Sequence, residues 1–330
     1  MKFPALRSAT GERAVLLLLL VLGLLVPFQN FFYVMFVMEV LCFALFASAF
    51  NLLFGFVGLL SFGHAALFGS AAYVTAYASS AWGLTPELAI AAGVLVSALL
   101  GYLMGALAVR RQGIYFAMIT FALAQMVFFL AVEMPFTKGE DGLQARRGKL
   151  LGLVDLRSDT SMYYFVFAVF VLSILFIRRL VRSPFGEVLK AIRENEPRAI
   201  SLGFDVDRFK LMAFVISGCL AGLAGSLKAL ALQLATLADV HFITSGEVVV
   251  MALLGGVGTI LGPSLGAALV VGLQNYLAAV GSWSTIANGL VFMLCVLCLR
   301  GGILGATVAA AKRLRLGHKA ASSRSDVKVT

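Results

Sequence analysis

The chain has 330 residues, of which 61% are hydrophobic and only 13% are charged, and its mean hydropathy is +0.99. A soluble domain is about 45–50% apolar and about 25% charged. This composition excludes a soluble globular domain, a disordered chain and a small secreted protein held by disulfides. Because so much apolar surface must face lipid or other helices, we predict an all-α, polytopic helical membrane protein.

Apolar runs follow one another along almost the whole chain. The first, residues 14–26, comes after Arg7 and Arg13, and no small-residue cleavage site follows it, so we expect an uncleaved first helix. The later runs are residues 31–54, 64–82, 87–109, 114–134, 163–177, 211–232, 242–255, 260–280 and 285–299. A membrane span needs about 17–25 residues, and several runs are shorter. We therefore predict about 8–10 transmembrane helices, some of them discontinuous.

Positive charges are concentrated in the segments between alternate spans. With both termini in the cytoplasm, 20 of the 26 Lys and Arg residues lie on the cytoplasmic side, as the positive-inside rule favours. The net charge of +10 then reflects membrane orientation, and it requires no nucleic-acid partner. The predicted order is a cytoplasmic N-terminus (1–13), a transmembrane domain (14–305) with a periplasmic loop (135–162) and a cytoplasmic loop (178–210), and a basic cytoplasmic tail (306–330).

The cytoplasmic loop at residues 178–210 has the sequence pattern of two short capped helices. Ser183 precedes a proline, which is the arrangement of an N-cap followed by Pro at the first helical position. Asn195 can cap a second helix, which Gly203 would end. Apolar side chains recur at helical spacing between the two caps, at Phe185, Val188, Leu189 and Ile192. Such a helix can lie on lipid headgroups, but two capped helices in a charged loop better fit docking into a groove of another subunit.

Two glycine-rich segments, residues 55–64 and 255–263, interrupt the apolar pattern. Glycine and proline free backbone groups that lipid cannot satisfy, so such backbone must be covered by protein or line a water-filled cavity. Interrupted segments in both halves of a transporter point to the translocation path. Close glycine-mediated packing of helices explains the two segments equally well.

Few ionisable or catalytic groups lie within the spans. A buried charge costs about 2.5–3.5 kcal/mol to insert, so Glu39 should be paired, protonated or functional. Lys228 is expected to extend outward from its helix end. Ser61 and His64 stand three residues apart, but Leu59 breaks the G-x-S-x-G pattern of a hydrolase. We expect His64 to bond backbone carbonyls at a helix end.

The cysteines and histidines give no metal-ligand spacing. The four cysteines all lie in apolar runs, at Cys42, Cys219, Cys295 and Cys298. The last two form a C-x-x-C pair, but the run that contains them supplies no further ligand. We therefore interpret the cysteines as small hydrophobic residues and predict no metal site.

Several motifs together resemble one known family. They are N-L-L-F-G-F-V-G-L-L-S-F-G-H within residues 49–73, G-I-Y-F-A-M-I-T at 113–120, the segments 183–196 and 210–214, and G-G-V-G-T-I-L-G-P at 255–263. In these motifs the chain resembles the permeases of branched-chain amino acid ABC transporters, of the type called LivM in that family. The resemblance extends over roughly residues 30–305.

That resemblance implies a mechanism and a set of partners. In the family, a second, homologous permease subunit pairs with the first in the lipid bilayer, two cytoplasmic ABC ATPases drive the pair, and a periplasmic substrate-binding protein delivers the substrate. The implied function is import of branched-chain amino acids across the bacterial cytoplasmic (inner) membrane by alternating access. The chain has no G-x-x-x-x-G-K-[ST] segment, so ATP would be used by its partners, and we expect neither enzyme activity nor a cofactor in this chain.

The resemblance also assigns roles to individual residues. The loop that would receive ATPase motion contains Arg193, Glu194, Glu196, Ala199 and Gly203. The segment T-K-G-E-D-G-L at residues 137–143 is similar to the family's outer-loop pattern T-G-G-x-D-G-L, with Lys138 in place of a glycine. That similarity places Asp141 and Gly142 on the loop that faces the binding protein. As candidates for the translocation path we take the glycine breaks and nearby polar groups: Glu39, Asn51, Ser61, His64, Thr120, Gly255, Gly256 and Gly258.

Three other functions fit parts of the sequence. A urea or short-chain amide permease would share the scaffold, and the sequence alone does not separate these substrates from leucine, isoleucine or valine. A proton-coupled secondary transporter would use Glu39, and an intramembrane hydrolase would need Ser61 as its nucleophile.

Overall fold

The computed structural model describes residues 33–150, 154–278, 289, 290 and 293. The predicted first helix, most of the predicted last span and the basic tail lie outside the described residues. Within the described part the chain is mostly helical, which confirms the fold class predicted from composition. The strands in that part are four of only two residues each, paired as β1–β4 and β2–β3, and turns and loops connect the helices.

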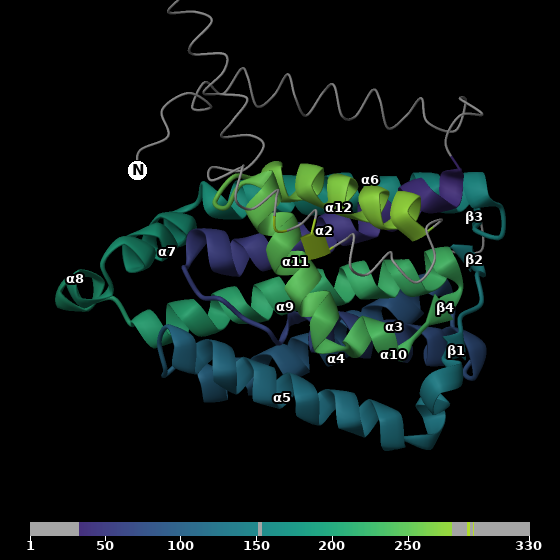
Figure 1. Ribbon diagram of the computed structural model, residues 1–330, viewed down its shortest axis with the longest axis horizontal. Helices are drawn as coiled ribbons and strands as arrows, with labels where there is room; N and C mark the ends of the chain where they lie inside the picture. The colour runs from purple at the N-terminus through teal and green to yellow at the C-terminus, as the bar shows by residue number, and fades with distance from the viewer. Residues whose placement is uncertain (1–32, 151–153, 279–288, 291–292, 294–330) are drawn as a thin grey trace, which may run out of the picture.

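The long helices, labelled as in Figure 1, are α2 (Val34–Phe56), α3 (His64–Ser80), α4 (Pro86–Ala108), α5 (Ile114–Glu133), α6 (Asp159–Val181) and α9 (Val206–Leu232). The shorter ones are α7 (Pro184–Glu194), α8 (Glu196–Ser201), α10 (Leu237–Val240), α11 (Phe242–Gly255) and α12 (Gly262–Ala278), with single 3₁₀ turns at Pro135–Thr137 and Gly139–Asp141. The strands are β1 (Leu143–Gln144), β2 (Lys149–Leu150), β3 (Val154–Asp155) and β4 (Leu234–Ala235). Because α6 continues to Val181 and α9 begins at Val206, both ends of the 178–210 segment are helical.

Five of the described helices are long and apolar enough to cross a membrane: α2, α4, α5, α6 and α9. The apolar helix α11 has 14 residues and therefore a length of about 21 Å. That length is shorter than the hydrocarbon core of a bilayer, which is about 30 Å thick. Together with α12, which follows it after the second glycine break, α11 fits the prediction of discontinuous helices.

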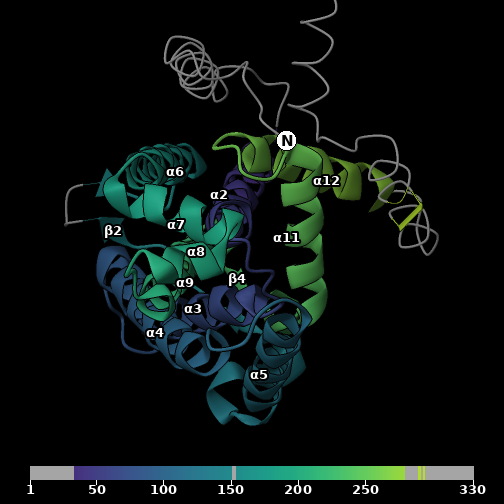
Figure 2. The same ribbon diagram turned by 90° about the vertical axis from the view of Figure 1, so that its left-hand side faces the viewer.

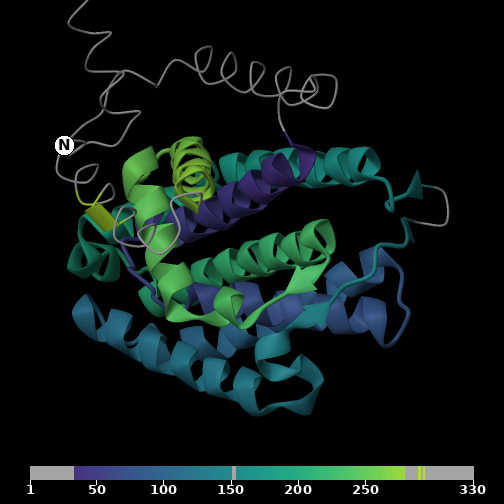
Figure 3. The ribbon, with the colours of Figure 1, turned by 45° about the vertical axis from the view of Figure 1, so that its right-hand side comes forward.

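The helices are arranged around α2 and α9. Figure 1 shows α2, α6 and α12 along one side, α9, α3 and α4 beneath them, and α5 at the opposite edge. Helix α11 runs across these layers, from α10 to α12 (Figures 2 and 3). In the most apolar windows of α2 and α9, 72% of the residues are buried, against 28% in α5 and 33% in α4. Helices α2 and α9 are thus the core, and α4 and α5 present most of their apolar surface outward.

Small residues let the core helices approach one another closely. Gly225 of α9 lies against the backbone of Phe68 in α3, so that a Cβ at this position would overlap the Phe68 carbonyl oxygen. Ser97 of α4 donates a hydrogen bond to the Gly218 carbonyl of α9 at 2.7 Å. This use of glycine and serine at contacts is typical of membrane helices, since lipid provides no hydrophobic force that would drive them together.

The loops at one end of the bundle, opposite α7 and α8, are held by Arg147 (Figure 1). Its side chain is almost fully buried and pairs with Asp159 at the start of α6, with 2.6 Å between Nη1 and Oδ1. It also donates to the carbonyls of Leu230 and Ala231 in the last turn of α9. Because the final carbonyls of a helix have no partner within it, one arginine here both caps α9 and ties it to α6.

Candidate functional site

The first glycine break begins where α2 ends. The carbonyl oxygen of Leu53 accepts hydrogen bonds from the amides of Val57, Gly58 and Leu59, at 3.1–3.3 Å. Gly58 has a φ of +87°, which lets the chain turn sharply away from the helix axis. Residues between Phe56 and His64 are irregular, and α3 starts only at His64. The break therefore lies at one end of the bundle, where α2 ends.

The second glycine break separates α11 from α12. Gly256 (φ +115°) and Gly258 (φ +78°) both adopt backbone conformations that disfavour a side chain. Gly255 lies directly against Gly262, so that a Cβ at Gly255 would overlap the Gly262 carbonyl oxygen. The hydroxyl of Thr259 donates to the Gly256 carbonyl at 2.7 Å. The glycines thus allow two helix ends to meet with almost no side chain between them.

Asn51 of α2 joins the two breaks. Its side chain is almost fully buried; Nδ2 donates to the Thr259 carbonyl at 2.8 Å, and Oδ1 accepts from the Gly258 amide at 2.9 Å. A Cβ added at Gly55 would lie 2.7 Å from the Gly258 nitrogen, so the backbones are in close contact there. We call Asn51, Gly55, Gly58, Gly258 and Thr259 the glycine junction. The structure thus shows close glycine-mediated packing at both breaks, at the ends of three helices.

Arg193, at the end of α7, lies against the glycine junction. Its Nη1 donates a hydrogen bond to the Gly55 carbonyl. A Cβ at Gly58 would come within 3.2 Å of the Arg193 Cγ, and one at Gly258 within 3.1 Å of Nη1. The carbonyl at the C-terminal end of a helix carries partial negative charge, which a guanidinium group stabilises. Arg193 therefore connects the projecting α7–α8 pair (Figure 1) to both breaks.

The other residues of the α7–α8 segment hold its shape. Ser183 caps α7 by accepting from the Gly186 amide, and Asn195 caps α8 by accepting from the Arg198 amide. Both caps agree with the sequence prediction, as does Gly203 (φ +87°), which follows the end of α8. Ala199 is buried in a small cluster with Ile192 and Val206.

Two acidic residues of this segment differ in their surroundings. Glu196 forms an ion pair with Lys210 of α9, with 2.5 Å between Oε1 and Nζ. The Lys210 side chain is only 2% exposed, so this pair anchors α8 to α9. Glu194 is exposed. Of the five residues assigned to this segment, Arg193 is the one that contacts the glycine junction.

Ser61 and Thr120 stabilise the loop between α2 and α3. The Ser61 hydroxyl accepts from the Gly63 amide at 3.1 Å, and the Thr120 hydroxyl accepts from the Phe62 amide at 3.2 Å. Both hydroxyl groups are buried. Ser61 is thus engaged by backbone two residues away, and its hydrogen bond is not to His64.

His64 lies at the first position of α3, as predicted for a helix end, but its partner differs from the prediction. Its Nε2 is 2.9 Å from the hydroxyl of Ser217 in α9, and that hydroxyl donates to the Ala49 carbonyl in α2 at 2.6 Å. The predicted bond to a backbone carbonyl is therefore wrong, because a serine of a third helix comes between. The chain of hydrogen bonds ties α3, α9 and α2 together in the core.

Lys228 overturns the prediction that it extends outward. Its side chain is 11% exposed and forms an ion pair with Asp239, which is 4% exposed. Asp239 also accepts from the backbone amide of Thr236, completing a capping box at the start of α10. Lys228 is enclosed because α10 and its preceding turn fold back over the end of α9. The sequence analysis missed Asp239, although the T-x-x-D spacing from Thr236 was a signal for it.

Glu39 belongs to the same region. The Lys228 ammonium lies 6.0 Å from the ring centroid of Phe43, which is one turn along α2 from Glu39. Glu39 therefore lies on the part of α2 that is close to the Lys228–Asp239 ion pair. Whether this carboxylate is paired, protonated or functional stays a prediction.

Asp141 and Gly142 directly precede β1, which lies at the end of the bundle opposite α7 and α8 (Figure 1). Asp141 is exposed, whereas Gly142 (φ +70°) is buried against the Ala235 carbonyl, where β1 and β4 pair. Lys138 adopts a left-handed conformation with φ 58°, which glycine would favour. The turn thus keeps a glycine-like backbone despite the lysine.

Comparison with known proteins identifies the family. A family model described as "Branched-chain amino acid transport system / permease component" matches residues 32–299, most of the chain. The chain belongs to this family. The resemblance inferred from the sequence motifs is thereby confirmed, and the helical, membrane-spanning architecture is that of a permease.

Individual relatives of this permease come from several organisms. LivM, the high-affinity branched-chain amino acid transport system permease protein of Salmonella typhimurium, is 30% identical over 281 residues, and the LivM protein of Escherichia coli is 28% identical over the same number; each match covers 78% of this chain. The chain spans 66% of the length of these two relatives. The ribose import permease protein RbsC of Bacillus subtilis is 29% identical over 192 residues, which are 53% of this chain and 57% of RbsC. No solved structure matches the chain.

Proposed function

We propose that this chain is the membrane-spanning permease subunit of an ATP-driven importer of branched-chain amino acids. Family membership and the names of the LivM relatives support this class of substrate. The observation that carries the proposed mechanism is the hydrogen bond from Arg193 to the Gly55 carbonyl. That bond connects a projecting helix pair to the ends of three helices, which is what transmission of an external movement requires.

In the proposed mechanism, α7 and α8 dock on a cytoplasmic ATPase subunit. ATP binding there displaces the helix pair, and Arg193 passes the displacement to Gly55 and Gly258. Helices α2, α11 and α12 then change their relative positions, and the path between them opens to one side or the other. ATP and the loaded receptor select between two states because they bind those states with different affinity.

The α7–α8 pair is built to move as one body. Its helices are capped by Ser183 and Asn195, and the Glu196–Lys210 ion pair fixes α8 to the start of α9. The exposed carboxylate of Glu194 lies at the end of α7, where a partner can contact it. A helix pair that moves as a rigid body passes a displacement on without deforming. These local contacts therefore favour coupling between the ATPase and the membrane-spanning helices.

The same proposal assigns partners and a location. A second, homologous permease subunit would pair with this chain, two ABC ATPases would bind on the α7–α8 side, and a periplasmic binding protein would contact the end that carries Asp141. The membrane would be the bacterial inner membrane. The apolar outward surfaces of α4 and α5, including Leu95 and Tyr115, would contact lipid or the second permease.

The proposed orientation places the two ends of the helix bundle on opposite sides of the membrane. Cysteines introduced at Gln144 and Arg198, both exposed and at opposite ends, should react with a membrane-impermeant maleimide from opposite sides of the membrane. In intact cells whose outer membrane is permeabilised, Gln144→Cys should label and Arg198→Cys should not, and inverted vesicles should give the reverse. The unsubstituted chain is the control, because it shows how much maleimide reacts with the cysteines already present. Labelling of both positions from one side would contradict the orientation.

The substrate class is tested by uptake in a strain from which this chain has been deleted. Restoring the chain together with its co-purifying subunits should raise uptake of labelled leucine at least tenfold. Labelled urea tests the amide alternative, and labelled ribose tests the activity named for the RbsC relative. Uptake of urea or ribose in place of leucine would overturn the substrate class. Uptake that persists without any ATPase but is lost in Glu39→Gln would favour proton coupling.

A further inference from the structure

A carboxylate lies on α11, the helix that crosses the bundle. Glu247 is in the first half of this 14-residue helix and is only partly exposed. Figure 1 shows α11 between the end of the bundle that carries α7 and α8 and the end that carries β1 and β4. A charged side chain at the depth of the hydrocarbon core is costly to insert, and such residues are usually paired or functional. The charge of Glu247 therefore needs a compensating group.

The hydrogen-bond partner of Glu247 is neutral. Gln274 of α12 donates from Nε2 to the Glu247 Oε1 at 2.9 Å. One turn further along α11 the two helices meet backbone to backbone, since a Cβ at Gly266 would overlap the Met251 carbonyl oxygen. Among the described residues, the second carboxylate oxygen, Oε2, forms no hydrogen bond. The Gln274 amide thus orients the carboxylate but does not balance its charge.

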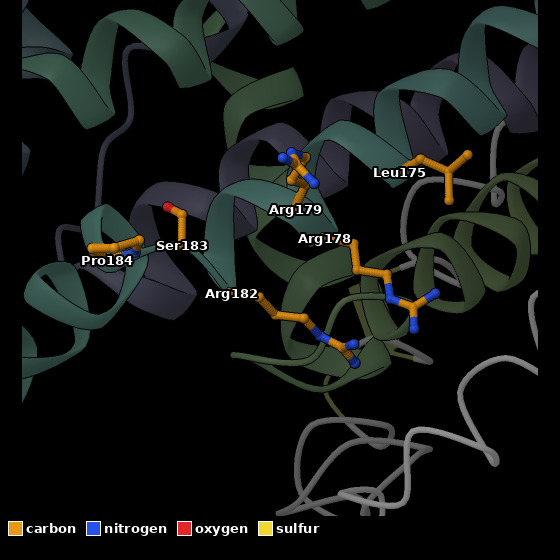
Figure 4. A pocket seen from close by; sticks show the side chains of 6 residues that line it. All are labelled: Leu175, Arg178, Arg179, Arg182, Ser183 and Pro184. Carbon is orange, nitrogen blue, oxygen red and sulfur yellow. The ribbon is translucent and has the colours of Figure 1, made fainter.

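Positive charges in the described part of the chain do not balance it either. Lys228 forms its ion pair with Asp239, and that pair has no net charge. Three arginines gather around a pocket of about 440 Å³ at the corner between α6 and α7 (Figure 4), at the end of the bundle that carries α7 and α8. Glu247 belongs to no ion pair among the residues that the structure describes. The site therefore suits a cation from outside this part of the chain.

The surface beside Glu247 has open space and aliphatic side chains. A Cβ at Gly246 would meet no atom within 4 Å, so space is open at the position next to the carboxylate. Ile243 and Leu253 are 56% and 38% exposed. They stand three residues before and seven residues after Gly246, and residues at these spacings lie on one face of a helix. This face of α11 thus combines an open position, a neighbouring carboxylate and an aliphatic surface.

We propose that this face of α11 binds the transported solute, with an ammonium group of the solute on Glu247 and its aliphatic part along Ile243 and Leu253. The ammonium supplies the missing positive charge, and a charge-assisted hydrogen bond to the carboxylate is strong where water is scarce. Acyl chains of lipid would cover the aliphatic side chains, but they would not balance the charge.

This assignment rests on the proposed function, in which the path opens between α2, α11 and α12. It adds the residue that contacts the solute and the group that the solute must carry. A solute with an ammonium group and an aliphatic chain fits the face, whereas urea and ribose have no ammonium group. Glu247 thus favours an amino acid over the two alternative solutes.

The charge of two thiol reagents tests the site in the full-length chain purified with its co-purifying subunits. Gly246→Cys is treated with aminoethyl methanethiosulfonate, a cation, or with sulfonatoethyl methanethiosulfonate, an anion. Peptide mass spectrometry reads the modification at position 246 apart from the cysteines already present. Relative to their rates with a free thiol, the cation should react at least tenfold faster than the anion, because the carboxylate attracts one reagent and repels the other.

Three variants separate the carboxylate from general access. Leu253→Cys, about 10 Å further along the same face, is the matched control and should show less than a threefold preference. Glu247→Gln in the Gly246→Cys chain should lower the preference to that of the control, while a glutamine pair can still form the hydrogen bond to α12. The exchange Glu247→Gln/Gln274→Glu returns a carboxylate to the same pair and should restore at least a fivefold preference. All variants should elute as the parent chain does.

Uptake is the second measurement. Without the cysteine substitution, Glu247→Gln should lower uptake of labelled leucine by the assembled importer at least tenfold. The proposal is overturned by equal preferences at positions 246 and 253, by a preference that survives Glu247→Gln, or by unchanged uptake in that variant. It is also overturned if neither reagent reacts at 246, or if Glu247→Gln loses the second permease subunit, since the carboxylate would then pair with a protein.

The two measurements fail separately. The reagent rates do not depend on transport, so a cation preference at position 246 without import of leucine would refute the proposed function and leave a cation site on α11. Import of leucine without that preference would refute the site and leave the proposed function standing.

Discussion

Replacing Arg193 with alanine is expected to lower substrate uptake at least tenfold while the ATPase subunits remain bound and active. The substitution removes the hydrogen bond to the Gly55 carbonyl and the side chain that packs on Gly58 and Gly258. Movement of α7 and α8 would then no longer reach the glycine junction. The measurement is ATP hydrolysis and labelled-leucine uptake by the assembled importer in proteoliposomes, expressed as substrate transported per ATP.

Arg198→Ala is the matched control for this prediction. Arg198 lies in the neighbouring helix α8, is exposed like Arg193, and uses its backbone amide in the contact with the Asn195 cap. Its substitution should leave the transport ratio within about twofold of the parent value. Arg193→Lys should be intermediate, because lysine keeps the charge but lacks the planar guanidinium group. A normal ratio in Arg193→Ala would show that coupling does not pass through the glycine junction.

Replacing Lys228 with methionine is expected to destabilise the folded chain by about 3–5 kcal/mol, the usual cost of removing one partner from a buried ion pair. Because methionine has nearly the same length and shape as lysine, the loss of stability would come from removal of the positive charge. Asp239 would lose its positively charged partner at a site where its side chain is only 4% exposed. The apparent melting temperature in detergent should fall by about 5 °C or more.

The double variant Lys228→Met/Asp239→Asn should recover part of that loss. Asparagine keeps an oxygen that can accept from the Thr236 amide, and it carries no charge that needs a partner. Replacement of a whole buried ion pair by neutral groups is often close to neutral in stability. The single variant Asp239→Asn shows how far that substitution alone lowers the melting temperature. If the double variant melts below Lys228→Met by that same amount, the effects of the two substitutions are additive. The two side chains would then not be coupled, and the ion pair would not explain their burial.

Local features of the fold could be predicted from the sequence because they depend on neighbouring residues. The caps at Ser183 and Asn195 and the turn at Gly203 follow from backbone conformations and hydrogen bonds within a few residues. The apolar runs predicted most helices for the same reason, since length and hydropathy are properties of a segment. Helix ends shifted by a few residues, as at α6, which continues through Arg178 and Arg179.

The candidate site depended on contacts that no local pattern contains. Asn51 and Gly258 are 207 residues apart in sequence, and Arg193 and Gly55 are 138 apart, yet each pair forms a hydrogen bond. The sequence identified these residues separately, as glycine breaks, a polar side chain and a charged loop. It did not indicate that they meet, because hydrogen-bonding side chains at helix ends have many possible partners until the helices pack.

The sequence by itself therefore determined that this protein is a bundle of apolar helices with two glycine breaks and a capped pair of helices between spans. Those properties follow from hydropathy, backbone freedom and short-range capping. Tertiary structure alone decided that Arg193 contacts both breaks and that Lys228 is buried against Asp239. The physical reason is that burial and ion pairing depend on which surfaces the packed helices cover, and a helix end that looks exposed in sequence is enclosed when another segment folds over it.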